Sequence, residues 1–212
     1  MSKLLILGAG GHGKVVADIA NILGQWDSIS FLDDKKDLKE VMGFPVIGKL
    51  MDYKAFKNDF KNAFIAIGNN SLRLSWLERL YKEGFIIPTI IHPQSIISKF
   101  ISIDYGTVVM AGVVVNTGTS IGRGCIINTG SSIDHDCKLG DGVHISPGAH
   151  IGGTAIIGSG AWLGIGSSIV NNIIIGNNSI VAAGAAVLEN IPDNVIVAGV
   201  PAIIKKVRVN KR

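Results

Sequence analysis

Residues 121–156 read IGRGCI INTGSS IDHDCK LGDGVH ISPGAH IGGTAI, which is a six-residue pattern written six times. Every block begins with an aliphatic residue, and the same phase continues in both directions along the chain. The aliphatic positions are Ile97, Ile103, Val109, Val115, Ile121, Ile127, Ile133, Leu139, Ile145, Ile151, Ile157, Leu163, Ile169, Ile175, Val181 and Val187. An unbroken period of this kind indicates a repeat architecture.

The other positions of the block explain the fold. Four positions after the aliphatic residue the side chain is usually small, and three positions after it stands Gly or Asn in thirteen of sixteen blocks. The aliphatic residue fills a narrow core, and Gly or Asn supplies the positive φ of a sharp corner. Three blocks form one coil, and successive coils pair as parallel strands about 4.8 Å apart. The repeat therefore predicts a three-sided parallel β-helix, with Cys125 and Cys137 as reduced core residues.

The N-terminal residues follow a different pattern. KLLILGAGGHGKVVADIANILG, from residue 3, predicts a strand, a glycine turn and a helix, and its glycines match G-x-G-x-x-G. Such glycines let backbone N–H groups approach a phosphate, although they also suit tight packing of a strand against a helix. ISFLDD and AFIAIGNN predict two more strands that end in polar residues, followed by a helix at 71–83 and a strand at 85–91. We expect an α/β Rossmann-like half-domain of three or four strands that binds a nucleotide sugar in residues 1–92. The β-helix and a C-terminal tail then occupy residues 93–212.

Charge is distributed unevenly along the 212 residues. Residues 97–191 contain only 8 charged side chains, with a net charge of −2, whereas the whole chain carries +4. So few charges suggest that much of this surface is built from small residues or covered by other subunits. No stretch approaches the roughly 18 apolar residues of a membrane span, and no basic segment is interleaved with aromatic residues for nucleic acid. The first residues, MSKLLILGAGGHG, lack a signal-peptide pattern, so we expect a cytoplasmic protein. The basic tail is interpreted as a solvated end; it contains Lys205, Lys206, Arg208, Lys211 and Arg212.

His135 and Asp136, in SSIDHDCKLG, are the best candidates for chemistry. Asp136 stands at the corner position that other blocks give to Gly or Asn, and a carboxylate there can raise the basicity of the imidazole and fix its tautomer. His144 is nine residues further along, which is half of an eighteen-residue coil. The two histidines should therefore lie on opposite sides of one chain. They can meet only across an interface, which predicts a cyclic homotrimer with sites between subunits.

Several motifs together resemble a known family. GAGGHG, FLDD, IAIGNN, NTGSSIDHD, HISPGAHIGG and VIVAGVPA, with the hexads, resemble the hexapeptide-repeat sugar acyltransferases of the sialic acid O-acetyltransferase type. The resemblance is strongest to bacterial UDP-4-amino-sugar N-acetyltransferases. It implies a left-handed β-helix, acetyl-CoA as co-substrate and no metal. The implied reaction is direct N-acetylation of the 4-amino group of a UDP-linked amino-dideoxysugar.

The resemblance also implies roles for individual residues. His135 would be the general base, and Asp136 its acidic neighbour. The positions implied for acetyl-CoA are His144, Gly153, Ile165 and Ala183. The positions implied for the UDP-sugar are Gly10, Gly11, His12, Asp33, Asp34 and Gly68.

Three other functions are compatible with parts of the sequence. One is O-acetylation of sialic acid or another sugar hydroxyl, which uses the same fold and co-substrate. A second is a γ-type carbonic anhydrase with zinc held by histidines between subunits, although the spacing of His135, His144 and His150 differs from that family. A third is a non-catalytic sensor of nucleotide sugars. The sequence leaves open the amino-sugar, the UDP or TDP carrier and the length of the acyl chain.

Overall fold

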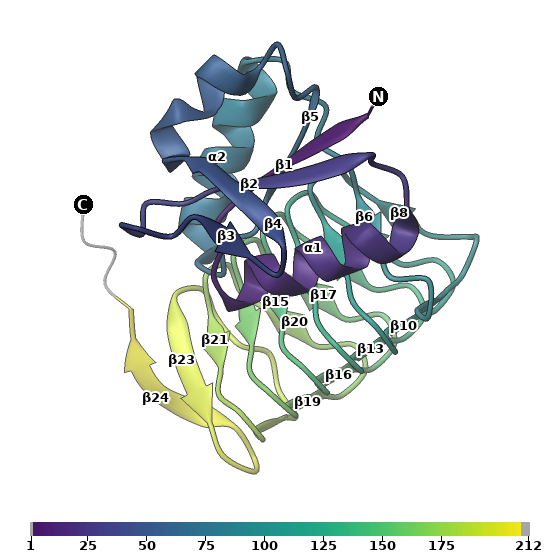
Figure 1. The fold of residues 1–212 in the computed structure, drawn as a ribbon. Helices are drawn as coiled ribbons and strands as arrows, with labels where there is room; N and C mark the ends of the chain where they lie inside the picture. The colour runs from purple at the N-terminus through teal and green to yellow at the C-terminus, as the bar shows by residue number, and fades with distance from the viewer. Residues whose placement is uncertain (1, 209–212) are drawn as a thin grey trace. The chain divides into compact units, whose positions relative to one another are not determined.

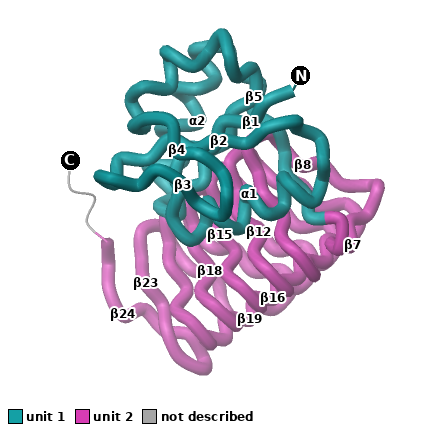
Figure 2. The backbone as a smooth tube through the Cα atoms, in the orientation of Figure 1, with its two compact units in different colours: residues 1–92 teal, residues 93–212 magenta. Residues whose placement is uncertain are grey.

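The structure is a computed structural model that describes residues 2–208. The chain forms two compact units, 1–92 and 93–212, drawn in teal and magenta in Figure 2. Lys211 and Arg212 of the basic tail lie outside the described residues.

The first unit is an α/β fold around a five-stranded sheet of order β3-β4-β2-β1-β5. Its elements are β1 Lys3–Leu7, α1 Gly11–Leu23, β2 Ser28–Leu32, β3 Glu40–Val41, β4 Phe44–Gly48, the 3₁₀ helix η1 Leu50–Phe56, β5 Asn62–Ile65, α2 Asn70–Lys82 and β6 Ile90–Ile91. β1 pairs in parallel with β2 on one side and with β5 on the other. Leu4, Leu5, Ile6 and Leu7 are all fully buried, as expected for a central parallel strand covered on both faces.

Sequence signals explain the two helices of this unit. α1 buries Val16, Ala17 and Ala20 on one face and ends at Gly24, which adopts a left-handed conformation with φ of 61°. α2 begins after Asn69, whose side chain accepts a hydrogen bond from the backbone N–H of Leu72. The bounds of α2 match the expected helix at 71–83 within one residue.

The sheet of the first unit is larger than the sequence predicted. β4 adds a parallel strand beside β2, and β3 pairs with β4 in an antiparallel hairpin. The strand expected at 85–91 was wrong over most of its length, because only an isolated bridge at Ile86 and the two-residue β6 form there. β3, β4 and residues 85–91 all lack the alternation of apolar and polar residues that identifies a strand.

The second unit is a parallel β-helix, which confirms the fold class expected from the hexads. Each aliphatic position ends a two-residue strand, and Figure 1 shows the successive coils stacked on one another. The strands are β7 Ile96–Ile97, β8 Ser102–Ile103, β9 Val108–Val109, β10 Val114–Val115, β11 Ser120–Ile121, β12 Ile126–Ile127, β13 Ser132–Ile133, β14 Lys138–Leu139, β15 His144–Ile145, β16 His150–Ile151, β17 Ile156–Ile157, β18 Trp162–Leu163, β19 Ser168–Ile169, β20 Ile174–Ile175, β21 Ile180–Val181, β22 Ala186–Val187, β23 Val195–Ala198 and β24 Ile203–Val207.

These strands form the three sides of the coil. Sheet 1 has the order β22-β19-β16-β13-β10-β7, and sheet 2 has the order β20-β17-β14-β11-β8. Sheet 3 contains β24-β23-β21-β18-β15-β12-β9. Within each sheet, neighbouring strands are one coil of eighteen residues apart, as in the pairing of Ile127 with Ile145. The exceptions are at the C-terminal end, where β23 and the antiparallel β24 complete sheet 3.

The core and the corners follow the predicted pattern. Ile133, Ile145 and Leu163 are fully buried, and so are small inward residues such as Cys125 and Cys137. Glycines three positions after the aliphatic residues have positive φ, for example Gly124 at 63° and Gly142 at 65°. Lys205 and Lys206 of the basic tail are part of β24 and are exposed. Of the helices within residues 2–208, none has the length and apolarity that a membrane crossing requires.

Candidate functional site

His135 and Asp136 form an exposed pair at the corner between sheets 1 and 2, directly after β13. His135 Nδ1 lies 2.9 Å from Asp136 Oδ2, and the two side chains are 52% and 61% exposed. Because a carboxylate only accepts hydrogen bonds, this contact places the proton on Nδ1 and leaves the lone pair of the neutral ring on Nε2. The pair can therefore take up a proton at Nε2 from a bound molecule.

Two carboxylates act on this imidazole. The hydrogen bond to Asp136 and, after it, the charge of Asp134 raise the pKa of His135 above its ordinary value. Asp134 is held in place because its Oδ1 accepts hydrogen bonds from Asn116 Nδ2, at 2.9 Å, and from the backbone N–H of His135, at 2.8 Å. The bond from Asn116 lowers the pKa of Asp134. The two acids together favour the imidazolium that proton uptake creates.

His144 lies in a different environment on sheet 3. Its ring stacks on the indole of Trp162, one coil further along, with ring centroids 5.6 Å apart and an interplanar angle of 7°. Trp162 Nε1 donates a hydrogen bond of 2.8 Å to Ser146 Oγ, which fixes the indole. A largely apolar pocket of about 410 Å³ opens beside this stack. Its lining includes His144, Ser146, Trp162, Ile165, Ala182 and Ala183.

The predicted acetyl-CoA positions are thus divided between two places. His144, Ile165 and Ala183 share the pocket on sheet 3, whereas Gly153 lies at the corner of His135, one coil further along. Sheet 3 is the side of the coil opposite the corner between sheets 1 and 2. A single chain therefore does not bring His135 and His144 together, in agreement with the half-coil spacing.

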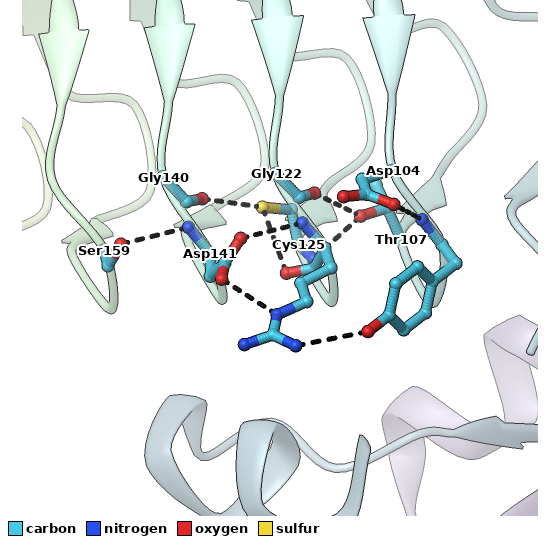
Figure 3. A network of polar contacts seen from close by, with 9 residues as sticks. Asp104, Thr107, Gly122, Cys125, Gly140, Asp141 and Ser159 are labelled. Carbon is cyan, nitrogen blue, oxygen red and sulfur yellow. Dashed lines mark hydrogen bonds and ion pairs between the residues drawn. The ribbon is translucent and has the colours of Figure 1, made fainter. Parts of the chain in front are cut away.

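Other charged and polar residues lie at the corner between sheets 2 and 3, where hydrogen bonds and an ion pair join them (Figure 3). Arg123 Nε donates to Asp141 Oδ2 at 2.9 Å, and Arg123 Nη1 donates to the hydroxyl of Tyr105 at 3.2 Å. These two partners, Tyr105 first, raise the pKa of Arg123. Further along the same corner, the backbone N–H of Asp141 donates to Ser159 Oγ. This network connects successive coils.

The inward hydroxyl and thiol groups beside this corner also connect coils. Thr107 Oγ1 donates to the carbonyl of Gly122 at 2.9 Å and accepts from the backbone N–H of Cys125 at 2.9 Å. Cys125 Sγ lies 3.2 Å from the carbonyl oxygen of Gly140. Burial is the main reason why the pKa of the other cysteine, Cys137, is raised. A buried thiol with a raised pKa is a weak nucleophile, which fits core packing.

In the first unit, the predicted nucleotide-sugar positions gather at the carboxyl ends of β1, β2 and β5. A pocket of about 390 Å³ is lined by the glycine turn, by Asp33 and by two cations, Lys14 and Lys35. Asp33 Oδ2 accepts a hydrogen bond of 2.7 Å from the backbone N–H of Ala9, and its Oδ1 accepts one of 2.8 Å from the backbone N–H of Lys35. Asp33 therefore fastens the glycine turn to the loop after β2.

The neighbouring acid, Asp34, has a similar role. Its Oδ1 accepts a hydrogen bond of 3.1 Å from the backbone N–H of Leu50, at the start of η1. It lines a second, more open hollow together with Lys36 and Asp52. Both acids are thus bound to backbone groups of their own unit, and one lone pair or more of each carboxylate is still available to a ligand.

His12 is half-buried at the first turn of α1. Burial and, secondarily, the nearby charge of Arg73 lower its pKa to about 4, so it is neutral at physiological pH. Its Nε2 atom is buried without a hydrogen-bond partner in the structure. Arg73 is 1% exposed, and its guanidinium donates to the carbonyls of Ile67 and Gly68 in the loop after β5. The carbonyl of Gly68 is thereby held in place by the buried guanidinium of Arg73.

Comparisons with known proteins agree with this architecture. The model of the PglD N-terminal domain matches residues 3–80, and that of the bacterial transferase hexapeptide (six repeats) matches 118–153 and 154–188. A UDP-N-acetylbacillosamine N-acetyltransferase of Bacillus subtilis (strain 168) is 40% identical over 115 residues. That alignment covers 52% of this chain and 52% of the relative, so it spans about half the length of the curated protein.

Solved structures match over nearly the whole chain. The acetyltransferase domain of PglB from Neisseria gonorrhoeae FA1090, in complex with acetyl coenzyme A, is 41% identical with a TM-score of 0.92. The match covers 95% of this chain and 98% of that one. The chain belongs to the hexapeptide-repeat acetyltransferases with a PglD-type N-terminal domain. A mutant of perosamine N-acetyltransferase from Caulobacter crescentus, in complex with CoA and GDP-perosamine, is 35% identical with a TM-score of 0.92. That match covers 97% of this chain and 98% of the other. The resemblance read from the motifs is confirmed.

Four residues that shape the candidate sites of this hexapeptide-repeat acetyltransferase were not predicted from its sequence. Trp162 had a detectable signal, because it stands eighteen residues after His144 and must be its neighbour in the next coil. Lys14 follows the glycine turn directly and could have been chosen as a phosphate ligand for that reason. Lys35 and Arg73 gave no comparable signal. Lys35 lies in the loop after β2, and Arg73 is a charged residue of α2 that is buried because its guanidinium donates to the carbonyls of Ile67 and Gly68. Among residues 2–208, no group of three or more His, Cys, Asp or Glu side chains is placed to hold a metal ion.

Proposed function

We propose that this protein transfers the acetyl group of acetyl-CoA to the 4-amino group of a nucleotide-linked amino-dideoxysugar, with UDP as the carrier. The observation that supports this proposal best is the exposed His135–Asp136 pair at a corner of the β-helix, with Nδ1 bound to the carboxylate. The solved relatives, one in complex with acetyl coenzyme A and one with CoA and GDP-perosamine, support the same reaction class.

The proposed mechanism is direct transfer with His135 as general base. The neutral sugar amine attacks the thioester carbonyl carbon, and His135 Nε2 takes the proton that the nitrogen loses. The tetrahedral intermediate collapses by breaking the C–S bond, which gives the amide and CoA thiolate. The imidazolium then returns its proton, and CoA leaves as the thiol. Asp136 holds the ring in the required tautomer throughout.

Acetyl-CoA is proposed to bind in the pocket beside His144 and Trp162. The pocket is largely apolar, which suits the acetyl group and its thioester, and His144 or backbone N–H groups would stabilise the oxyanion. The indole of Trp162 stacks on this imidazole. Ile165 and Ala183 would line the remainder of the groove, and Gly153 would contact the same co-substrate beside His135.

The nucleotide sugar is proposed to bind at the loops of the first unit. Gly10, Gly11 and His12 present the N-terminus of α1, whose partial positive charge favours phosphate. Lys14 and Lys35 line the same pocket and offer two ammonium groups to a phosphate, beside the carboxylates of Asp33 and Glu40. Asp33, Asp34 and Gly68 would complete the site around the ribose and base.

The proposal includes a homotrimer with active sites between subunits. His135 and the pocket of His144 lie on opposite sides of one coil, so a complete site needs two chains. The cytoplasmic location expected from the sequence stays part of this proposal.

The test is an assay of thiol release from acetyl-CoA with a panel of UDP-, TDP- and GDP-linked 4-amino-sugars. Free sialic acid is the control that represents O-acetylation of a hydroxyl. We expect turnover with a UDP-4-amino-sugar and a loss of about 10²-fold or more in kcat for His135→Ala. Near-parent rates for His135→Ala would show that His135 is not the base. Turnover with sialic acid alone would favour the O-acetyltransferase.

A further inference from the structure

Gly153 lies directly against the imidazole of His135, one coil further along the β-helix. A Cβ atom built on Gly153 would lie 2.6 Å from Nε2, 2.8 Å from Cε1 and 3.1 Å from Cδ2 of His135. Non-bonded carbon and nitrogen atoms do not approach so closely. The ring therefore occupies the space in which any other residue at 153 would place its side chain.

The backbone does not require glycine at this position. Gly153 is not among the residues with positive φ. The same position, two after the aliphatic residue, holds a residue other than glycine in every other block. These residues are Lys99, Tyr105, Ala111, Thr117, Arg123, Thr129, His135, Asp141, Pro147, Ser159, Ile165, Asn171, Asn177, Ala183 and Glu189. Gly153 is thus the one glycine at this block position, and the residue at the same position in the coil before it is His135.

The coil before His135 leaves space for Asp136, the partner of His135. A Cβ atom on Gly118 would lie 2.2 Å from Asp136 Oδ1. Gly118 also has a φ of 74°, so the corner itself accounts for that glycine. Gly153 lacks this second reason, and the space for the imidazole is what remains to explain it.

We propose that Gly153 is a positioning residue, whose missing side chain lets the His135 imidazole lie across the next coil with Nδ1 at Asp136. This inference rests on the proposed function, in which His135 is the base. This role is additional to the contact with acetyl-CoA that the proposed function gives to Gly153, and kcat and KM for acetyl-CoA separate the two roles.

A methyl group at 153 should displace the ring and leave the coil intact. The imidazole is the far end of a half-exposed side chain, so it can swing into solvent at little cost to the fold. The ring then loses Asp136 and its fixed place. A displacement of about 1 Å at a reacting group can cost about 10²-fold in rate.

The experiment compares Gly153→Ala with Asn171→Ala, which places the same methyl group at the equivalent position one coil further along. Thermal unfolding is measured first, and we expect similar midpoints for both variants and the parent. Steady-state kinetics with acetyl-CoA and the best UDP-4-amino-sugar should then show kcat lowered about 10²-fold for Gly153→Ala, with KM for acetyl-CoA changed less than about threefold. Asn171→Ala should keep parent kinetics.

A second readout does not depend on turnover. The chain has five histidines, so ¹⁵N-histidine labelling with His135→Ala for assignment gives the pKa of His135 by NMR. In Gly153→Ala we expect this pKa to fall towards the ordinary value of about 6.5. An unchanged pKa with an unchanged kcat would overturn the inference, and so would a loss confined to KM for acetyl-CoA. If His135→Ala keeps its activity, the proposed base is wrong, while the NMR titration still reports whether Gly153 positions the ring.

Discussion

Asp136 adopts a left-handed backbone conformation, with φ of 58°, at a corner position that most other blocks give to glycine. This conformation is uncommon for any residue other than glycine, and aspartate is one of the few that tolerate it. At this corner the carboxylate reaches the imidazole of His135, which offsets the cost. The residue is therefore better explained by its partner, His135, than by the corner.

Asp136→Asn tests the charge without disturbing the corner. Asn172 and Asn178 occupy the equivalent position in other coils with φ of 61° and 56°, so the amide fits the backbone. Because Asp136 raises the pKa of His135, its neutralisation should lower that pKa. A base works when deprotonated, so kcat/KM rises with pH through this pKa, and the rise should move to lower pH.

The plateau of the Asp136→Asn profile should also fall, by about tenfold or more, because the base is weaker and no longer held in one tautomer. The measurement is kcat/KM as a function of pH for the parent and the variant. A profile that superimposes on that of the parent would separate Asp136 from the chemistry.

At the scale of the element, each short strand of the β-helix directs one residue inwards and its neighbour outwards. In β20, Ile175 is fully buried and its neighbour Ile174 is 47% exposed, although the two are the same amino acid. Ile175→Ala should lower the free energy of unfolding by about 2–5 kcal/mol, because it leaves a cavity in a narrow core. Ile174→Ala, the matched control, should change it by about 0.5 kcal/mol.

Chemical denaturation of both variants measures this difference. Equal effects would contradict the assignment of inside and outside positions. Such a result would also show that the outer face of β20 is packed against something outside the single chain.

The β-helix could be predicted residue by residue because each side chain repeats the same environment every eighteen positions. Ile133 and Ile151, for example, are partners in neighbouring strands because they stand eighteen residues apart. β3 and β4 of the first unit could not be predicted, since β3 has two residues and Val41 is the one buried residue of the two strands. The candidate site divides in the same way. The places of His135 and His144 follow from the repeat, whereas the buried position of Arg73 depends on the fold of one loop.

At the scale of the whole molecule, the topology of the coil makes a prediction about assembly. His135 is at the corner between sheets 1 and 2, and the pocket of His144 is on sheet 3. We consider a site that takes its base from one chain and its acyl-CoA pocket from the next. His135→Ala then removes the group supplied by the first chain, and His144→Ala removes the group supplied by the second. Each homomeric variant should be nearly inactive, because all of its sites lack one of the two groups.

Mixed trimers of the two variants should recover activity. An interface at which the His144→Ala chain supplies His135 and the His135→Ala chain supplies His144 is intact. Random assembly from an equal mixture makes about a quarter of the interfaces of this kind, so activity should return to about a quarter of the parent value. The chains are unfolded and refolded together to exchange subunits, and light scattering checks that the product is a trimer. Mixing the folded variants without exchange is the control and should restore nothing. If the refolded mixture stays as inactive as its parts, each site belongs to a single chain, and the proposed assembly is wrong.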